Sequence, residues 1–120
     1  MRLYVETIPH NEQRYNTVGD WWKDDNGTIQ IRVSDTGNEK YNFLIALHEL
    51  VEQQLCEYRG VSEESVTAFD KKFTGTGEPG DDPKAPYQLE HGFATGVERL
   101  LASALNIKWK DYETKVDSHS

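Results

Sequence analysis

Hydrophobic and polar residues alternate along the first forty residues of the chain, as they do in β-strands. The alternation covers residues 2–8, where a proline ends it, and returns in residues 18–23 and 28–33. An Asn-Gly turn at residues 26–27 separates the second and third segments, and this dipeptide is the strongest short-range signal of a β-hairpin. We expect a small, mainly antiparallel sheet of about three strands, with residues 1–40 forming a β-rich part.

From residue 41 onward, apolar residues recur every three or four positions, and this spacing predicts three helices. The helices are expected at residues 41–58, 62–73 and 87–106. In the first helix the apolar stripe consists of Leu44, Leu47, Val51, Leu55 and Tyr58. In the third helix six residues are expected to face the core, namely Leu89, Phe93, Val97, Leu100, Leu101 and Ala104.

The order of these elements predicts an α+β fold, in which a small antiparallel sheet is followed by three helices. We interpret residues 1–120 as a single domain, with a helical part at residues 41–106. Residues 74–86 are rich in Gly and Pro and are expected to form a long loop of the kind that often has a function. Residues 107–120 are interpreted as a polar tail.

The composition narrows the range of functions. The chain has 21 Asp and Glu residues against 13 Lys and Arg residues, which gives a formal charge of −8 at pH 7. This acidity argues against binding to nucleic-acid backbones or anionic membranes, because both need clustered cations. No apolar run is long enough for a membrane span, and no signal sequence is evident. The single cysteine, Cys56, fits a reducing compartment, so we expect a cytoplasmic protein.

The clearest chemical signal is the motif H-E-x-x-E, formed by His48, Glu49 and Glu52. On a helix, His48 and Glu52 lie one turn apart on the same face, so their nitrogen and oxygen atoms can bind one metal ion. Both residues flank the expected buried face, where a carboxylate is costly unless it has a partner. We therefore expect Glu52 to be paired with a cation.

Residues 41–52 resemble the active-site helix of the zincin metallopeptidases, in which an apolar stretch leads into the motif H-E-x-x-H. The likeness covers residues 28–58, because a strand precedes the helix in zincins as it is predicted to do here. It implies a zinc ion bound by His48 and Glu52, with Glu49 as the general base that activates the metal-bound water. The chain departs from the family at Glu52, which stands where zincins have histidine.

His91 is the best candidate for a third ligand, because it lies at the start of the third helix just after the Gly- and Pro-rich loop. With His48 and Glu52 it would complete a set of two histidines and one carboxylate, as in the common catalytic zinc site. Glu98 lies two turns farther along the same helix and is a candidate ligand or hydrogen-bond acceptor for His91. Asp70, on the second helix, is a further candidate of the same kind.

Three functions are compatible with these residues. The first is a zinc-dependent hydrolase of a peptide or a small molecule, with Glu49 as general base. The second is a magnesium-dependent nucleotide pyrophosphohydrolase, which would use carboxylates drawn from Glu49, Glu52, Glu64, Asp70 and Glu98. The third is non-enzymatic. The chain also resembles small acidic phage or prophage proteins, and this likeness implies binding to a host protein in the cytoplasm of an infected bacterial cell.

The same residues also allow a purely structural interpretation. In that case His48 is a core histidine bonded to a backbone carbonyl, and Glu52 is its ion-pair partner one turn away. Cys56 lies one turn farther on, and we interpret it as a small buried hydrophobe rather than a ligand. The metal content and the distance between His48 and His91 distinguish these interpretations. The sequence predicts neither the substrate nor the oligomeric state.

Overall fold

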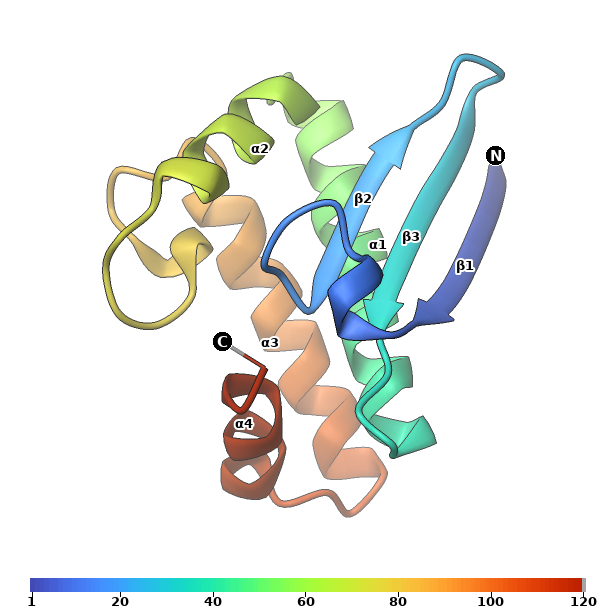
Figure 1. Ribbon diagram of the computed structural model, residues 1–120, viewed down its shortest axis with the longest axis vertical. Helices are drawn as coiled ribbons and strands as arrows, with labels where there is room; N and C mark the ends of the chain where they lie inside the picture. The colour runs from blue at the N-terminus through green and yellow to red at the C-terminus, as the bar shows by residue number, and fades with distance from the viewer. Residues whose placement is uncertain (120) are drawn as a thin grey trace.

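The three strands form a small sheet at one side of the molecule. The computed structural model describes residues 1–119 and contains the strands β1 (Arg2–Ile8), β2 (Gly19–Lys23) and β3 (Thr28–Ser34). β2 and β3 form the expected hairpin, and Gly27 in its turn has a φ of 79°, a conformation that favours glycine. Figure 1 shows β3 in the middle of the sheet, between β1 and β2.

The sheet is mixed, so the prediction of a mainly antiparallel sheet is wrong in this detail. β1 pairs with β3 in parallel along its whole length, whereas β2 pairs with β3 in the antiparallel sense. The connection at residues 9–18 is long enough to let β3 lie between β1 and β2 instead of joining these two in a hairpin. β1 is therefore an edge strand, and Leu3 and Val5 on it are 42% and 46% exposed.

Four helices follow the sheet, namely α1 (Glu39–Arg59), α2 (Glu63–Lys72), α3 (Gln88–Ala104) and α4 (Trp109–Asp117). Two short 3-10 helices, η1 (His10–Glu12) and η2 (Pro79–Asp81), lie in the loops. The side chains of Asn38 and Ser62 accept hydrogen bonds from the first backbone N–H groups of α1 and α2. Gly60, at a φ of 76°, ends α1. The predicted α+β fold class is confirmed.

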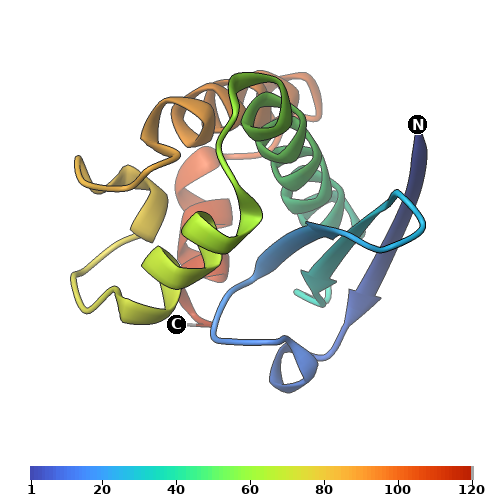
Figure 2. The same ribbon diagram turned by 90° about the horizontal axis from the view of Figure 1, so that it is seen from above.

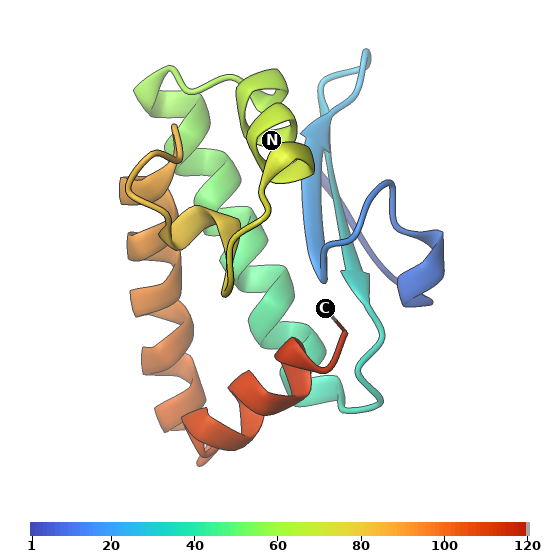
Figure 3. The same cartoon turned by 60° about the vertical axis from the view of Figure 1, so that its left-hand side comes forward.

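α1 is the central element of the fold. It packs against β2 and β3 and also against α3, so that the sheet and α3 lie on different sides of it (Figure 2). α2 and α4 lie near opposite ends of this helix pair (Figure 3). The apolar core includes Ile31, Val33 and Leu44, each of which is completely buried. Within residues 1–119, no helix is both long and apolar enough to cross a membrane.

α3 faces the core with a different side from the one that its apolar stripe predicts, although Leu101 of that stripe packs against the core. Leu89, Phe93 and Leu100 are 61%, 70% and 73% exposed. The buried residues of the helix are Glu90, His91, Ala94, Glu98 and Ala102. Apolar periodicity identifies an amphipathic helix, but it does not show which polar side chains have partners inside the protein. On the inward side they do have partners, as in the ion pair of 2.6 Å between Arg59 and Glu90.

The buried row of α1 is also displaced from the predicted stripe. Tyr58, at the end of that stripe, is 79% exposed. The buried residues of the helix are Leu44, Ile45, His48, Glu52, Gln53 and Cys56. The row with His48 and Glu52 therefore faces inward, and Cys56 is buried as expected.

The predicted polar tail contains a helix, so this part of the interpretation is wrong. α4 covers residues 109–117, and Tyr112 at its centre is 2% exposed. Trp109 and Val116 pack against the core on the same side of the helix. These three residues recur at intervals of three and four, so the stripe is present in the sequence but is short and surrounded by charged residues.

Candidate metal centre

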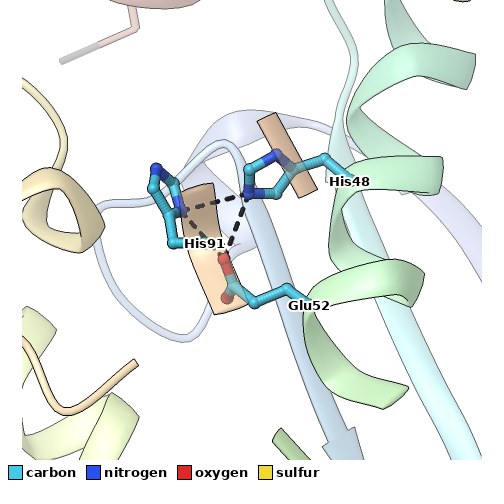
Figure 4. A group of neighbouring side chains, drawn as sticks. All are labelled: His48, Glu52 and His91. Atoms are coloured by element: carbon cyan, nitrogen blue, oxygen red, sulfur yellow. Dashed lines mark hydrogen bonds and ion pairs between the residues drawn. The ribbon is translucent and has the colours of Figure 1, made fainter. Parts of the chain in front are cut away.

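Three predicted ligands meet between α1 and α3. His48 and Glu52 extend from neighbouring turns of α1, and His91 extends toward them from the first turn of α3 (Figure 4). Nε2 of His48 lies 3.1 Å from Oε2 of Glu52 and 3.2 Å from Nδ1 of His91. Nδ1 of His91 lies 2.9 Å from the same Glu52 oxygen. We call His48, Glu52 and His91 the ligand triad.

The geometry of the ligand triad fits a zinc ion. Its two imidazole nitrogens and one carboxylate oxygen are ordinary zinc ligands, and all three residues are at least 94% buried. Ligand atoms about 2.0–2.1 Å from a tetrahedral zinc ion are roughly 3.3–3.4 Å apart from one another. The separations in the ligand triad, 2.9–3.2 Å, are close to this spacing. The three atoms are thus already gathered around one point.

Two members of the ligand triad, His48 and Glu52, contact other side chains through the atoms that face away from the triad. Nδ1 of His48 lies 2.7 Å from Oε1 of Glu98, and the hydroxyl group of Tyr112 donates to the other oxygen of Glu98. Trp21 donates its indole N–H to Oε1 of Glu52 over 2.9 Å. Such outer hydrogen bonds fix the orientation of metal-binding side chains. Glu98 therefore contacts His48, and not His91 as the sequence suggested.

The third member, His91, meets the loop before α3. Its Nε2 lies 2.8 Å from Oε2 of Glu78 and 3.3 Å from Oδ1 of Asp81. Between these two residues, Gly80 packs directly on the imidazole ring, and a Cβ there would lie 2.4 Å from Cγ of His91. Only a residue without a side chain allows the loop to approach the ring so closely.

The ion pairs of the ligand triad shift its pKa values in opposite directions. Burial lowers the pKa of both imidazoles, but the neighbouring carboxylates outweigh burial, so the pKa of His48 is well above 6.5 and that of His91 is about 10. Burial raises the pKa of Glu52, but hydrogen bonds from the two histidines outweigh burial and lower this pKa to about 2. Without a metal, the positive charge that Glu52 needs comes from protonated histidines.

Glu49 lies beside the ligand triad without belonging to it. Its Oε2 is 4.0 Å from Nε2 of His48, and its side chain is 12% exposed. Burial and the charge of Glu52 raise the pKa of Glu49 well above its ordinary value. Gly19 packs against this side chain, because a Cβ there would lie 2.6 Å from Cδ of Glu49. The predicted general base is thus held at the edge of the site by a close contact with β2.

The ligand triad and Glu49 line a cavity of about 430 Å³. This volume is in the range of pockets for small ligands. Asp70 lies on the wall of the cavity, where it accepts hydrogen bonds from the hydroxyl groups of Tyr15, over 2.8 Å, and of Tyr87. Burial raises the pKa of Asp70 to about 6. Among the contacts within residues 1–119, Asp70 has none with the ligand triad, so it is placed as a wall residue.

Four residues of the site were not predicted as such: Trp21, Glu78, Asp81 and Tyr112. Each reaches the site from a segment far from α1 in the sequence, so no spacing rule connects it to the H-E-x-x-E motif. The one local signal was the Gly- and Pro-rich loop, which pointed to a functional segment without identifying its acids as partners of His91.

Comparison of the chain with protein-family models, with curated proteins and with solved structures found no match. The functional interpretation therefore rests on the geometry of the ligand triad and of the residues around it.

Proposed function

We propose that this protein binds one zinc ion at the ligand triad and acts as a metal-dependent hydrolase. The observation that supports the proposal is the convergence of three buried ligand atoms, 2.9–3.2 Å apart, on two helices that are distant in sequence. A core histidine with a purely structural role needs only one acceptor for its single N–H group. Here two histidines instead direct a nitrogen at the same carboxylate oxygen, and this arrangement is the one expected of a metal site.

The ligand atoms favour zinc over magnesium. Magnesium prefers six oxygen ligands and retains several waters, whereas two of the three atoms here are imidazole nitrogens. The nucleotide pyrophosphohydrolase alternative also relied on Asp70 and Glu98 as ligands. Asp70 bonds to tyrosines and Glu98 bonds to His48 and Tyr112, so neither adds a free oxygen at the triad.

The surrounding residues suit hydrolysis. Zinc bound at such a site polarises a carbonyl group and lowers the pKa of water toward about 7. Glu49 is close enough to act on a proton at the cavity side of the triad, and burial together with the charge of Glu52 raises its pKa, which makes it a stronger base than an exposed carboxylate. The cavity of about 430 Å³ accommodates part of a peptide or a small molecule.

The first test is the metal content of the purified protein, measured by elemental analysis. We expect one zinc per chain in the parent protein and in the Glu49→Gln variant, because Glu49 is not a ligand. His48→Ala and Glu52→Ala are expected to lose the metal. A parent protein that is free of stoichiometric zinc, after purification without chelators and with zinc added, would contradict the proposal.

The second test is hydrolysis of a quenched fluorescent peptide library by the zinc-loaded protein. We expect Glu49→Gln to lower kcat by about 10²–10⁴-fold while zinc stays bound, as is usual for the loss of a general base. Zinc binding without any hydrolysis in the parent protein would support a structural metal site, and with it the non-enzymatic alternative in which the protein binds a host protein.

A further inference from the structure

His91 is the one member of the ligand triad whose outer atom faces a loop and not a helix or strand. The residue is 6% exposed, and Nε2 makes no hydrogen bond of good geometry within the described part of the chain. The nearest acceptor is Oε2 of Glu78, at 2.8 Å, which is within hydrogen-bond distance but does not meet the angular requirements of a hydrogen bond. A buried ring N–H group in this position needs an acceptor.

The two nitrogens of His91 have different tasks. Nδ1 faces the other two members of the triad, so a metal-binding imidazole has to present its lone pair on that atom. A neutral imidazole that binds through Nδ1 carries its hydrogen on Nε2. That hydrogen points to the loop, where Glu78 and Asp81 supply the carboxylates nearest to it.

The loop reaches His91 independently of the charge on Glu78. The backbone of η2 is closed by hydrogen bonds from the N–H groups of Asp81 and Asp82 to the carbonyls of Glu78 and Pro79. Gly80 then rests on the ring, and this contact needs no ionised group. The side chain of Glu78 is 47% exposed, so solvent on one side leaves room for its carboxylate to turn into line with the N–H group. Removing its carboxylate leaves the backbone contacts in place.

Glu78 and Asp81 can be told apart by distance and exposure. The oxygen of Glu78 is 0.5 Å closer to Nε2 than the oxygen of Asp81, which lies at 3.3 Å on a side chain that is 67% exposed. Asp81 therefore provides a matched control, because it carries the same charge on the same loop but lies farther from the Nε2 hydrogen.

We propose that Glu78 is a positioning residue for the metal centre: it accepts the Nε2 hydrogen of His91 and so directs the Nδ1 lone pair toward the ion. This inference rests on the proposed zinc site and adds to it a dependence on the loop at residues 74–86. Glu78 accepts a hydrogen bond from His91 as Glu98 does from His48, but Glu78 lies in the loop between α2 and α3, whereas Glu98 lies on the buried face of α3.

The test compares zinc dissociation constants, measured by competition with a chromophoric chelator, for the parent protein and three variants. Glu78→Ala is expected to weaken zinc binding by about 10–100-fold, the usual effect of losing an outer hydrogen-bond partner of a metal ligand. Asp81→Ala is expected to change it by less than about threefold, as for an exposed charge. Glu78→Gln, whose amide oxygen also accepts a hydrogen bond, is expected to lie between the parent and Glu78→Ala.

A second readout separates positioning from a general loss of structure. In the zinc-loaded parent, the Nε2 hydrogen of His91 is expected to give a protected proton NMR signal. Glu78→Ala is expected to lose this signal, while the metal-free variant still unfolds in one cooperative thermal transition and so remains folded. Zinc affinity within about threefold of the parent in Glu78→Ala would overturn the inference alone. A larger loss of zinc affinity in Asp81→Ala than in Glu78→Ala would also overturn it. The same holds if the parent binds two zinc ions per chain and Glu78→Ala removes one of them. A parent without zinc would overturn the proposed function as well.

Discussion

Glu52 has the central place in the charge balance of the site, because one of its oxygens meets both histidines and the other accepts the indole N–H of Trp21. A buried carboxylate with these contacts remains ionised only beside a positive charge. In the metal-free protein that charge is a proton on each histidine, and with zinc bound it is the ion. The two forms must therefore respond to pH in opposite ways.

We expect the metal-free protein to lose stability as the pH rises from about 6.5 to about 10. The pKa of His91 is raised from 6.5 to about 10 in the folded state, so its ion pairs contribute stability below pH 6.5 that is lost as the pH passes through the folded pKa. The measurement is the free energy of urea unfolding against pH in the presence of a chelator. His91→Asn is the control, because it lacks this component.

Zinc affinity is expected to rise over the same pH range, since each histidine must lose the proton on its metal-facing nitrogen before it binds the ion. Competition titrations at several pH values would reveal this trend. A metal-free stability that increases from pH 6.5 to 10, with His91→Asn showing the same slope, would contradict the assignment of these protons.

Gly80→Ala is expected to weaken zinc binding by at least about tenfold, because the added Cβ would force the ring of His91 out of line with the triad. The control is Gly96→Ala. Gly96 lies in α3 with free space around it, and replacement by alanine there should leave zinc affinity unchanged and raise stability by about 0.4–1 kcal/mol. Chelator competition and urea unfolding give the two numbers. Equal zinc affinity in both variants would show that the loop is not held against His91.

At the scale of the elements, periodicity predicted where helices and strands occur better than it predicted which side they bury. β1 is predicted at residues 2–8 and found there, and the α1 prediction differs from the structure by a few residues at its start. These elements follow from local alternation, turns and caps. The buried side of α3 does not follow from such local signals, because its inward polar residues depend on partners in α1, α4 and the loop.

Because α3 buries a different side from the predicted one, two adjacent residues on it give a testable contrast. Phe93→Ala is expected to change the free energy of unfolding by about 0.5 kcal/mol or less, because Phe93 is 70% exposed. Ala94→Leu is expected to cost about 1–3 kcal/mol, because Ala94 is completely buried and a larger side chain would strain the packing. Urea unfolding measures both. A loss of about 3 kcal/mol or more in Phe93→Ala would instead indicate a core residue.

At the scale of the whole molecule, the site combines one local pair with several distant partners. His48 and Glu52 could be predicted as a pair because a helix repeats every 3.6 residues. His91 lies 43 residues from His48, and only its residue type and its place after the loop suggested it. Trp21 and Tyr112 could not be found from the sequence, because an aromatic residue that bonds a buried carboxylate has the same local pattern as one that only packs.

The ligand triad joins α1 to α3, so zinc is expected to stabilise the whole fold. A metal that binds only the native state raises the free energy of unfolding by RT ln(1 + [L]/Kd), which is about 2.7 kcal/mol when free zinc is 100 times the dissociation constant. The formal charge of −8 also becomes less negative when the ion binds, which reduces repulsion among the 21 acidic residues.

We expect this stabilisation in the parent protein and in Glu49→Gln, and its absence in His48→Ala, when unfolding is followed in urea with buffered zinc or with a chelator. Glu49→Gln is the informative control, because it alters the adjacent buried carboxylate without removing a ligand. If zinc stabilised the parent and His48→Ala equally, the ion would be bound elsewhere, since a site that retains only Glu52 and His91 has lost one of its three converging atoms and most of its affinity.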